Sequence, residues 1–212
     1  MGIDSLSTPL HQAVKKLCEG PDGLYYALLF QGGITCFDKD IEKFLPVRFD
    51  KPLELKDILD FCWNDGSLYL VTSQGLFESR IVRKTEGKHD FVLCLLNPEP
   101  LVRGKVAHLC SDRKTNLYFS VNQRKVVHYD LVAKKTSLIK EYSVVNRLFL
   151  RHGYLWICRL WDDIICYDLK TNEERVISME GKDQSEFSNS YVTDLVLKDN
   201  RTFYFDNLEW IV

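Results

Sequence analysis

Residues 116–139 read NLYFSVNQRKVVHYDLVAKKTSLI and contain three short runs in which apolar side chains alternate with other side chains. Alternation with a period of two places successive side chains on opposite faces of a β-sheet, and the polar residues between the runs mark tight turns. The stretch therefore predicts three antiparallel strands. A sheet of this size has an apolar face that it cannot bury by itself, so other parts of the sequence must cover it.

The rest of the sequence repeats this unit, and an aligned aromatic residue marks each of five copies. The spacings between successive aromatic residues are 44, 49, 38 and 48 residues, and the residues themselves are Tyr25, Tyr69, Tyr118, Trp156 and Tyr204. Nine or ten residues before each aromatic, a polar residue precedes a large apolar one, as in Asp60-Phe61 and Arg147-Leu148. After the aromatic, three copies end a strand with an aromatic-Asp pair, in ITCFD at 34–38, VVHYD at 126–130 and IICYD at 164–168.

Each copy holds about four strands in about 40 residues, which is the length expected for a propeller blade. The chain resembles the β-propellers of the WD40-like superfamily, with Phe-Asp or Tyr-Asp where that family often has Trp-Asp, and without its usual Gly-His element. The resemblance covers nearly the whole chain. It implies an all-β fold of four-stranded antiparallel blades, in which each blade covers the apolar face of its neighbour.

We predict a single propeller domain over residues 1–212, with blades at about residues 11–50, 56–97, 104–142, 143–180 and 190–212. Residues 3–10 precede the first inner strand and are expected to pair as the outer strand of the fifth blade, which closes a five-bladed ring. The alternative is that the five repeats are part of a larger propeller, or of one that a partner completes.

The composition excludes several classes of function. The 28 basic and 30 acidic side chains give a formal net charge of −2, so there is no overall basic excess to attract nucleic acid or an anionic membrane, and neither is an expected partner. No apolar run is long enough to span a bilayer, and the N-terminal residues do not resemble a signal peptide. Seven cysteines without a CxxC pair predict reduced thiols in a cytosolic or nuclear protein, and no cofactor is predicted.

One polar position precedes the inner-strand anchor of every repeat. Its five residues form a predicted channel ring, namely Lys16, Asp60, His108, Arg147 and Asp194. Such a ring either binds a ligand or consists of solvated and mutually paired side chains, and we favour the second interpretation because structural ion pairs mimic functional clusters.

Three cysteines share a further equivalent position in successive repeats. Zinc favours sulfur ligands, so Cys18, Cys62 and Cys110 are conceivable ligands of a metal ion. Repetition of one buried position explains their spacing equally well, because free cysteine is among the most buried residue types. We therefore predict no metal site.

The segment RLWDD, residues 159–163, is predicted to form the hairpin between the second and third strands of the fourth blade. It is the one hairpin of its kind with a Trp at the tip, and Trp and Arg are enriched in binding hot spots. We predict a partner-binding site with Trp161 as the anchor, Gln123, Arg124 and Arg159 as polar contacts, and Asp162 and Asp163 facing a basic partner. The alternative is a Trp that folds against its own blade.

These features predict a non-catalytic scaffold that binds another protein or a peptide, with association into an oligomer left open. No Ser-His-Asp, Cys-His or Gly-rich phosphate pattern is present, so an enzyme is not expected. The alternative function comes from the resemblance, because five-bladed propellers also host glycosidases. In that interpretation Asp60 and Asp194 would be the two channel carboxylates that such a hydrolase needs.

Overall fold

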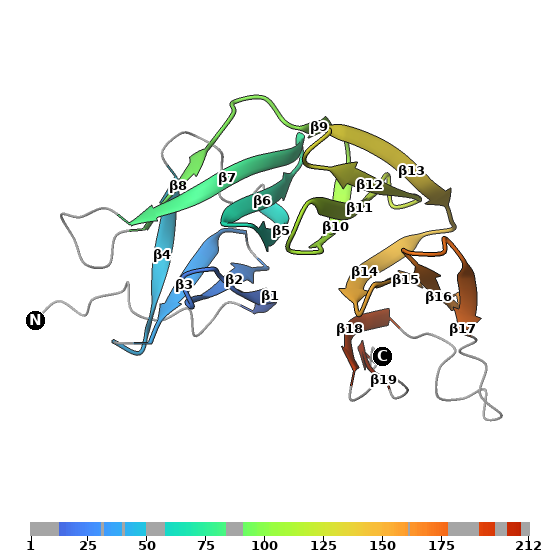
Figure 1. Ribbon diagram of the computed structural model, residues 1–212. Helices are drawn as coiled ribbons and strands as arrows, with labels where there is room; N and C mark the ends of the chain where they lie inside the picture. Colours follow the sequence, from blue (N-terminus) through green and yellow to red (C-terminus); the bar gives the residue numbers. More distant parts are fainter. Residues whose placement is uncertain are drawn as a thin grey trace, which may run out of the picture. The chain divides into compact units, whose positions relative to one another are not determined.

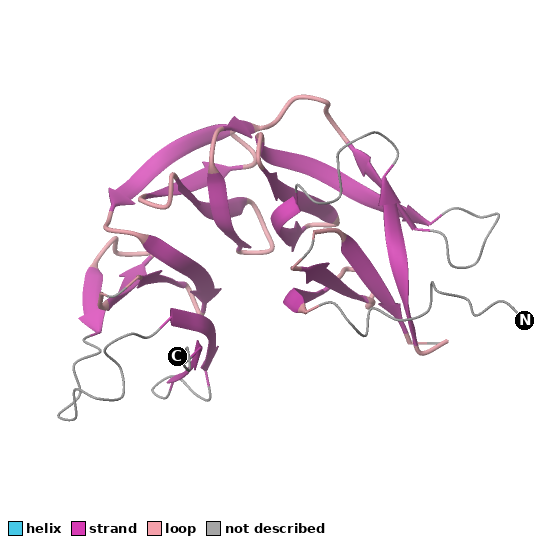
Figure 2. Cartoon of the chain, turned by 180° about the vertical axis from the view of Figure 1, so that it is seen from behind, coloured by secondary structure: helices cyan, strands magenta, loops and turns pink. Residues whose placement is uncertain are grey.

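The computed structural model describes residues 13–30, 32–39, 41–49, 58–83, 91–160, 162–177, 191–197 and 203–208, the last two segments mainly through their backbone. Within these residues all regular structure is β-strand, and Figure 2 shows strands and loops without a helix. The prediction of an all-β fold is therefore confirmed. None of the described segments is a helix with the length and hydrophobicity needed to cross a membrane.

The strands pair with their neighbours along the chain in five antiparallel groups, called the first to the fifth sheet below, and Figure 1 labels the strands in order. The first two groups are joined into one nine-stranded sheet, which differs from the separate four-stranded blades predicted for them. The first sheet contains β1 (Val14–Glu19), β2 (Tyr25–Leu29), β3 (Ile34–Asp38) and β4 (Lys43–Phe49). The second contains β5 (Ile58–Asn64), β6 (Ser67–Thr72), β7 (Gly75–Arg83) and β8 (Phe91–Leu95). The third contains β10 (Val106–Ser111), β11 (Asn116–Val121), β12 (Lys125–Asp130) and β13 (Lys135–Glu141). The fourth contains β14 (Val145–Arg151), β15 (Tyr154–Arg159), β16 (Ile164–Asp168) and β17 (Glu174–Ile177), and the fifth contains β18 (Tyr191–Leu197) and β19 (Phe203–Leu208).

A β-bulge recurs at one position in four of the five repeats. The pairing of the first strand with the second shifts register at Val14/Lys16, Ile58/Asp60, Val145/Arg147 and Val192/Asp194. A bulge inserts one unpaired residue and re-aims the side chain that follows it. In these four repeats the residue after the shift is the polar residue that the sequence assigned to the channel ring, so their inner strands align as the repeat predicts.

The aligned aromatic residue also has one structural position, with a correction in the first repeat. Tyr69 pairs with Cys62, which directly follows the inner-strand anchor. The residue that follows the first anchor is Cys18, and it pairs with Tyr26. Tyr26, and not Tyr25, is therefore the equivalent residue. Two adjacent tyrosines satisfied the sequence pattern equally well, and only strand pairing distinguishes them.

The aspartate of the aromatic-Asp pair closes the turn that follows it. The Asp130 Oδ1 atom accepts hydrogen bonds from the backbone N–H groups of Val132 and Ala133, at 2.8 and 2.9 Å. Asp168 holds Lys170 and Thr171 in the same way, at 2.8 and 3.2 Å. Hydrogen bonds to the ionised form, the one from Ala133 above all, lower the pKa of Asp130 below its ordinary value. The repeated Asp therefore has a local structural role.

The chain divides into two compact units, residues 1–107 with 113–115, and residues 108–112 with 116–212. In the first unit, Tyr26, Leu28 and Ile34 of the first sheet pack against Phe61 and Leu70 of the second. In the second unit, the face presented by residues 116–139 is covered by the fourth sheet. This cluster joins Tyr118 and Val126 to Leu148, Leu155 and Ile157. Each fully buried side chain of this size contributes about 1.5–3 kcal/mol to folding.

Two features of the first unit were not predicted. The outer strands of the first two sheets pair in parallel, with Val47 opposite Phe91 and Phe49 opposite Leu93. The connection after β8 also contains a short strand, β9 (Val102–Arg103), which pairs with the start of β7. Alternation identifies a strand and its buried face, but it does not show which strand edges pair with each other.

Gly75 is the residue that allows β9 to approach β7. It has a φ of +142°, and a Cβ atom at this position would lie 2.0 Å from the backbone oxygen of Val102. Because the obstacle is backbone, it cannot turn away as a flexible side chain can. Glycine is required here for both its conformation and its size.

We expect Gly75→Ala to lower the free energy of unfolding by more than about 2 kcal/mol, measured by urea denaturation. Gly66→Ala is the matched control in the same sheet, because Gly66 also has a positive φ, of +78°, but no atom within 4 Å of its added Cβ. Gly66→Ala should lower the free energy of unfolding by about 1–2 kcal/mol, because of the backbone conformation alone. Equal losses in the two variants would contradict the proposed clash.

Candidate partner-binding site

Three chain connections of the second unit lie side by side and are joined through their backbones. The Tyr142 N–H donates to the Arg124 carbonyl at 2.9 Å, and the Val145 N–H donates to the Gln123 carbonyl at 2.7 Å. The Leu160 N–H donates to the Val144 carbonyl at 2.8 Å. We use the term hairpin surface for residues 122–124, 142–144, 160, 162 and 163. It contains the β11–β12 and β15–β16 hairpins with the β13–β14 connection between them.

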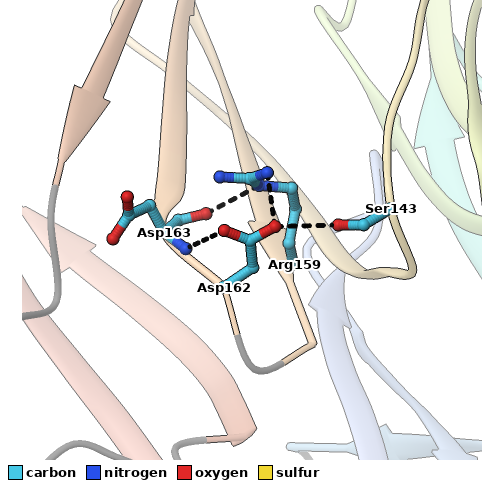
Figure 3. Close-up of polar contacts among 4 residues, drawn as sticks. All are labelled: Ser143, Arg159, Asp162 and Asp163. Carbon is cyan, nitrogen blue, oxygen red and sulfur yellow. Dashed lines mark hydrogen bonds and ion pairs between the residues drawn. The ribbon is translucent and has the colours of Figure 1, made fainter.

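The Arg159 side chain stabilises the β15–β16 hairpin through contacts within the hairpin. Its Nη1 atom lies 2.5 Å from Asp162 Oδ2, and its Nε donates to the Asp163 carbonyl at 2.9 Å. Ser143 Oγ donates to the same Asp162 oxygen at 3.1 Å. Figure 3 shows the Asp162 carboxylate held by Arg159 and Ser143, while the Asp163 side chain points away from the guanidinium. The predicted site residues Arg159, Asp162 and Asp163 are thus brought together.

The pairing changes the roles expected for these residues. The Arg159 side chain is 16% exposed and that of Asp162 is 37% exposed, so the arginine lies largely beneath the acid. A partner would meet Asp162 with part of its charge already compensated. Gln123 and Arg124 are exposed on the neighbouring hairpin and remain available as polar contacts. The predicted anchor Trp161 lies outside the described residues.

The β11–β12 hairpin has an unusual backbone conformation. Asn122 and Gln123 have φ values of 53° and 55°, which are the two left-handed positions of a type I′ turn. Asn tolerates this region, but Gln adopts it rarely. The Gln123 carbonyl is the acceptor for Val145, so the surrounding hydrogen bonds stabilise the conformation. Positions of this kind cluster at binding and catalytic sites.

The buried Tyr142 side chain anchors the middle of the hairpin surface to the sheets beneath it. Its side chain is buried, and its hydroxyl donates to Glu174 Oε1 on β17 at 2.5 Å. Lys140 Nζ lies 2.5 Å from the other carboxylate oxygen of Glu174. Burial alone would raise the pKa of Glu174, but the hydrogen bonds from Lys140 and Tyr142 lower it below its ordinary value. The network links the third and fourth sheets beneath the surface.

The members of the predicted channel ring differ in their surroundings. In the first unit, Lys16 Nζ and Asp60 Oδ1 form an ion pair at 2.7 Å, and the Phe61 N–H donates to the same oxygen at 2.8 Å. In the second unit, His108 and Arg147 lie on β10 and β14, at the equivalent positions. Of Asp194 on β18 only the backbone is described. Pairing between neighbouring ring residues is therefore observed for Lys16 and Asp60.

The predicted cysteine position is occupied by free thiols. Cys62 is buried, whereas Cys18 and Cys110 are partly buried. Across the described part of the chain, no three His, Cys, Asp or Glu side chains are grouped closely enough to hold a metal ion. Other cysteines are deeper in the sheets, and burial raises the pKa values of both the Cys36 and Cys158 thiols to about 12.

A cavity of about 530 Å³ in the first unit was not predicted from the sequence. It lies between the first two sheets, at the ends of β3 and β7, and its lining includes Asp22, Tyr26, Asp38, Arg83 and Phe91. The Tyr26 hydroxyl donates to Asp22 Oδ2 at 2.6 Å. The Asp38 carboxylate is nearly buried and lies 3.7 Å from the Arg83 guanidinium. Asp22, Asp38 and Arg83 of the lining are thus paired or hydrogen bonded within the protein.

We expect Asp60→Asn to lower the free energy of unfolding by about 1–3 kcal/mol, because the carboxylate is buried and bonded to both Lys16 and the Phe61 N–H. Lys16→Met should lower the free energy of unfolding by a smaller amount, because the Lys16 side chain is more exposed than that of Asp60. Urea denaturation of both variants and of the double variant measures the coupling between them. Strictly additive losses would contradict a direct interaction.

Native-state alkylation tests the burial of the thiols. At pH 8 a thiol with a pKa of about 12 is ionised to about 1 part in 10,000, so Cys36 and Cys158 should resist iodoacetamide in the folded protein. The more accessible Cys18 should react first, and all seven cysteines should react in urea. Peptide mass spectrometry reads out each site. Equal native rates at Cys18 and Cys36 would contradict the structure.

Comparison with known proteins finds similarity in the fold. No protein-family model and no curated protein sequence matches the chain. The extracellular domain of a one-component system from Bacteroides thetaiotaomicron has a TM-score of 0.69 and 13% identity, over 91% of this chain and 27% of that one. An auxiliary nutrient binding protein of the same organism has a TM-score of 0.62 and 16% identity, over 92% of this chain and 52% of that one.

A chain of the mitotic checkpoint complex has a TM-score of 0.59 and 15% identity, over 89% of this chain and 57% of that one. The chain thus spans about a quarter to just over half of these proteins. Propeller-like proteins are among the similar structures. At such low identities the likeness concerns the fold alone, which is all-β and built from successive antiparallel sheets.

Proposed function

We propose that the protein is a non-catalytic interaction module that binds another protein or a peptide on the hairpin surface. The observation that carries this proposal is the backbone bonding of three connections into one surface. Loops on a rigid scaffold commonly provide binding residues. A surface that is already ordered loses little conformational entropy when a partner binds, which favours affinity.

The exposed side chains suggest how a partner is recognised. Arg124 contributes a cation that extends from the β11–β12 hairpin, and Val144, 40% exposed, contributes an apolar contact between the hairpins. Asp162 is a hydrogen-bond acceptor fixed in place by Arg159 and Ser143. In the sequence, Trp161 stands between Leu160 and Asp162, and we retain it as the proposed aromatic anchor of the site.

We further propose that the five repeats are propeller blades. The support is the recurring β-bulge and the propeller-like proteins among the similar structures. The predicted fifth outer strand, residues 3–10, lies outside the described residues, so its pairing stays a prediction. The proposed location is the cytosol or the nucleus, because all seven cysteines are free and disulfides persist in oxidising compartments.

The similar proteins support a binding role only in general terms. One is named as a nutrient binding protein and another as part of a checkpoint complex, so each is described by what it binds or assembles with. Neither name identifies a ligand for this chain. The partner class proposed here rests on the hairpin surface itself.

Affinity purification with mass spectrometry tests the proposal. We expect Trp161→Ala and Arg124→Glu each to reduce recovery of the principal partner at least tenfold, because hot-spot residues contribute about 2 kcal/mol or more. Lys170→Glu is the matched control, since Lys170 is exposed in the β16–β17 turn outside the hairpin surface. Circular dichroism should show the same fold in all three variants. Unchanged recovery of the partner with both Trp161→Ala and Arg124→Glu would contradict the proposal.

A further inference from the structure

Arg147 is distinguished by its position in the repeat. It lies on β14 immediately after the β-bulge, opposite Cys158 of β15. Lys16 and Asp60 hold the equivalent positions on β1 and β5, directly after the same bulge. Arg147 is also only two residues from Val145, whose N–H bonds to the β11–β12 hairpin. It therefore lies on an inner strand, beside the hairpin surface.

The charged residues at this position have different partners in the two units. In the first unit, Lys16 and Asp60 neutralise each other at 2.7 Å. In the second unit, the Arg147 guanidinium forms no hydrogen bond or ion pair in the described structure, and its Nε is buried without an acceptor. A guanidinium is a cation with five N–H donors, so among the described residues this position holds a positive charge with no acidic partner.

Such an arrangement is unfavourable for folding and favourable for binding. A buried donor without an acceptor destabilises the folded state, and Arg147 has one at Nε although its side chain is only partly buried. An oxyanion removes this cost, because the planar guanidinium matches a carboxylate or phosphate with two parallel N–H···O bonds. In a partly desolvated site these bonds are stronger than they would be in water.

We propose that Arg147 binds a carboxylate of an acidic segment in a partner polypeptide. His108 lies at the equivalent position on β10 of the same unit. The site extends the hairpin surface inward, so the assignment of the anion to a protein partner rests on the proposed function. The anion-binding property itself does not, because it follows from Arg147 alone.

The experiment uses a defined probe and the whole chain of 212 residues. Fluorescence anisotropy of fluorescein-labelled hexaglutamate is measured at low salt, with unlabelled hexaglutamate and inorganic phosphate as competitors. We expect Arg147→Met to weaken hexaglutamate binding at least tenfold and Arg147→Lys to weaken it less. The matched control is Arg151→Met, because Arg151 is exposed at the far end of the same strand and donates to the Leu150 carbonyl.

Thermal denaturation supplies a second readout that a purely structural role would not give. Removing a buried donor that has no acceptor should leave the Tm of Arg147→Met equal to or above that of the natural chain. Added hexaglutamate should raise the Tm of the natural chain and not that of the variant. A hexaglutamate affinity that is undetectable, or unchanged in Arg147→Met, would overturn the proposal.

Two further outcomes would also overturn it. A Tm loss in Arg147→Met that disappears in an Asp194→Asn background would identify Asp194 as the internal partner of the arginine. Stabilisation by inorganic phosphate without hexaglutamate binding would assign the site to a free anion. Because the probe replaces the natural partner, failure here leaves the pull-down result for the hairpin surface unaffected, and the two proposals fail separately.

Discussion

Burial of one sheet face by the next is the interaction on which the rest of the structure depends. A single four-stranded repeat of about 40 residues exposes an apolar face, and it is too small to be stable in that state. Tyr26 and Tyr118 illustrate the solution, since each is nearly buried by the inner and second strands of the following sheet. The hairpin surface exists because this stacking brings neighbouring connections close enough for backbone hydrogen bonds.

The sequence predicts the parts of the fold that depend on local periodicity. Alternation in NLYFSV and KVVHYD gives the strands, and the recurring polar residue before the anchor coincides with the β-bulge. The pairing of β4 with β8 depends on contacts between distant segments, so no local pattern indicates it. The shift from Tyr25 to Tyr26 has the same cause, because strand register is decided by the partner strand.

The candidate site was predictable to a smaller extent. The repeat placed RLWDD in a hairpin, and the structure confirms that β15 ends at Arg159 and β16 begins at Ile164. The sequence could not show that Arg159 holds Asp162, because the same residues fit an outward orientation. Nor could it show that Lys16 and Asp60 pair while Arg147 has no partner in the described structure, since that depends on side-chain placement in neighbouring sheets.

The parallel pair between β4 and β8 has a consequence for how such a chain can evolve. Repeat proteins gain and lose whole modules, and a module held only by face-to-face packing can be removed so that its neighbours re-stack. The first two sheets share backbone hydrogen bonds at their rims as well. Deletion of either would leave the other with a bare strand edge, which is prone to aggregation. Residues 14–95 should therefore be gained or lost together in recombination, as one block twice the length of the basic repeat.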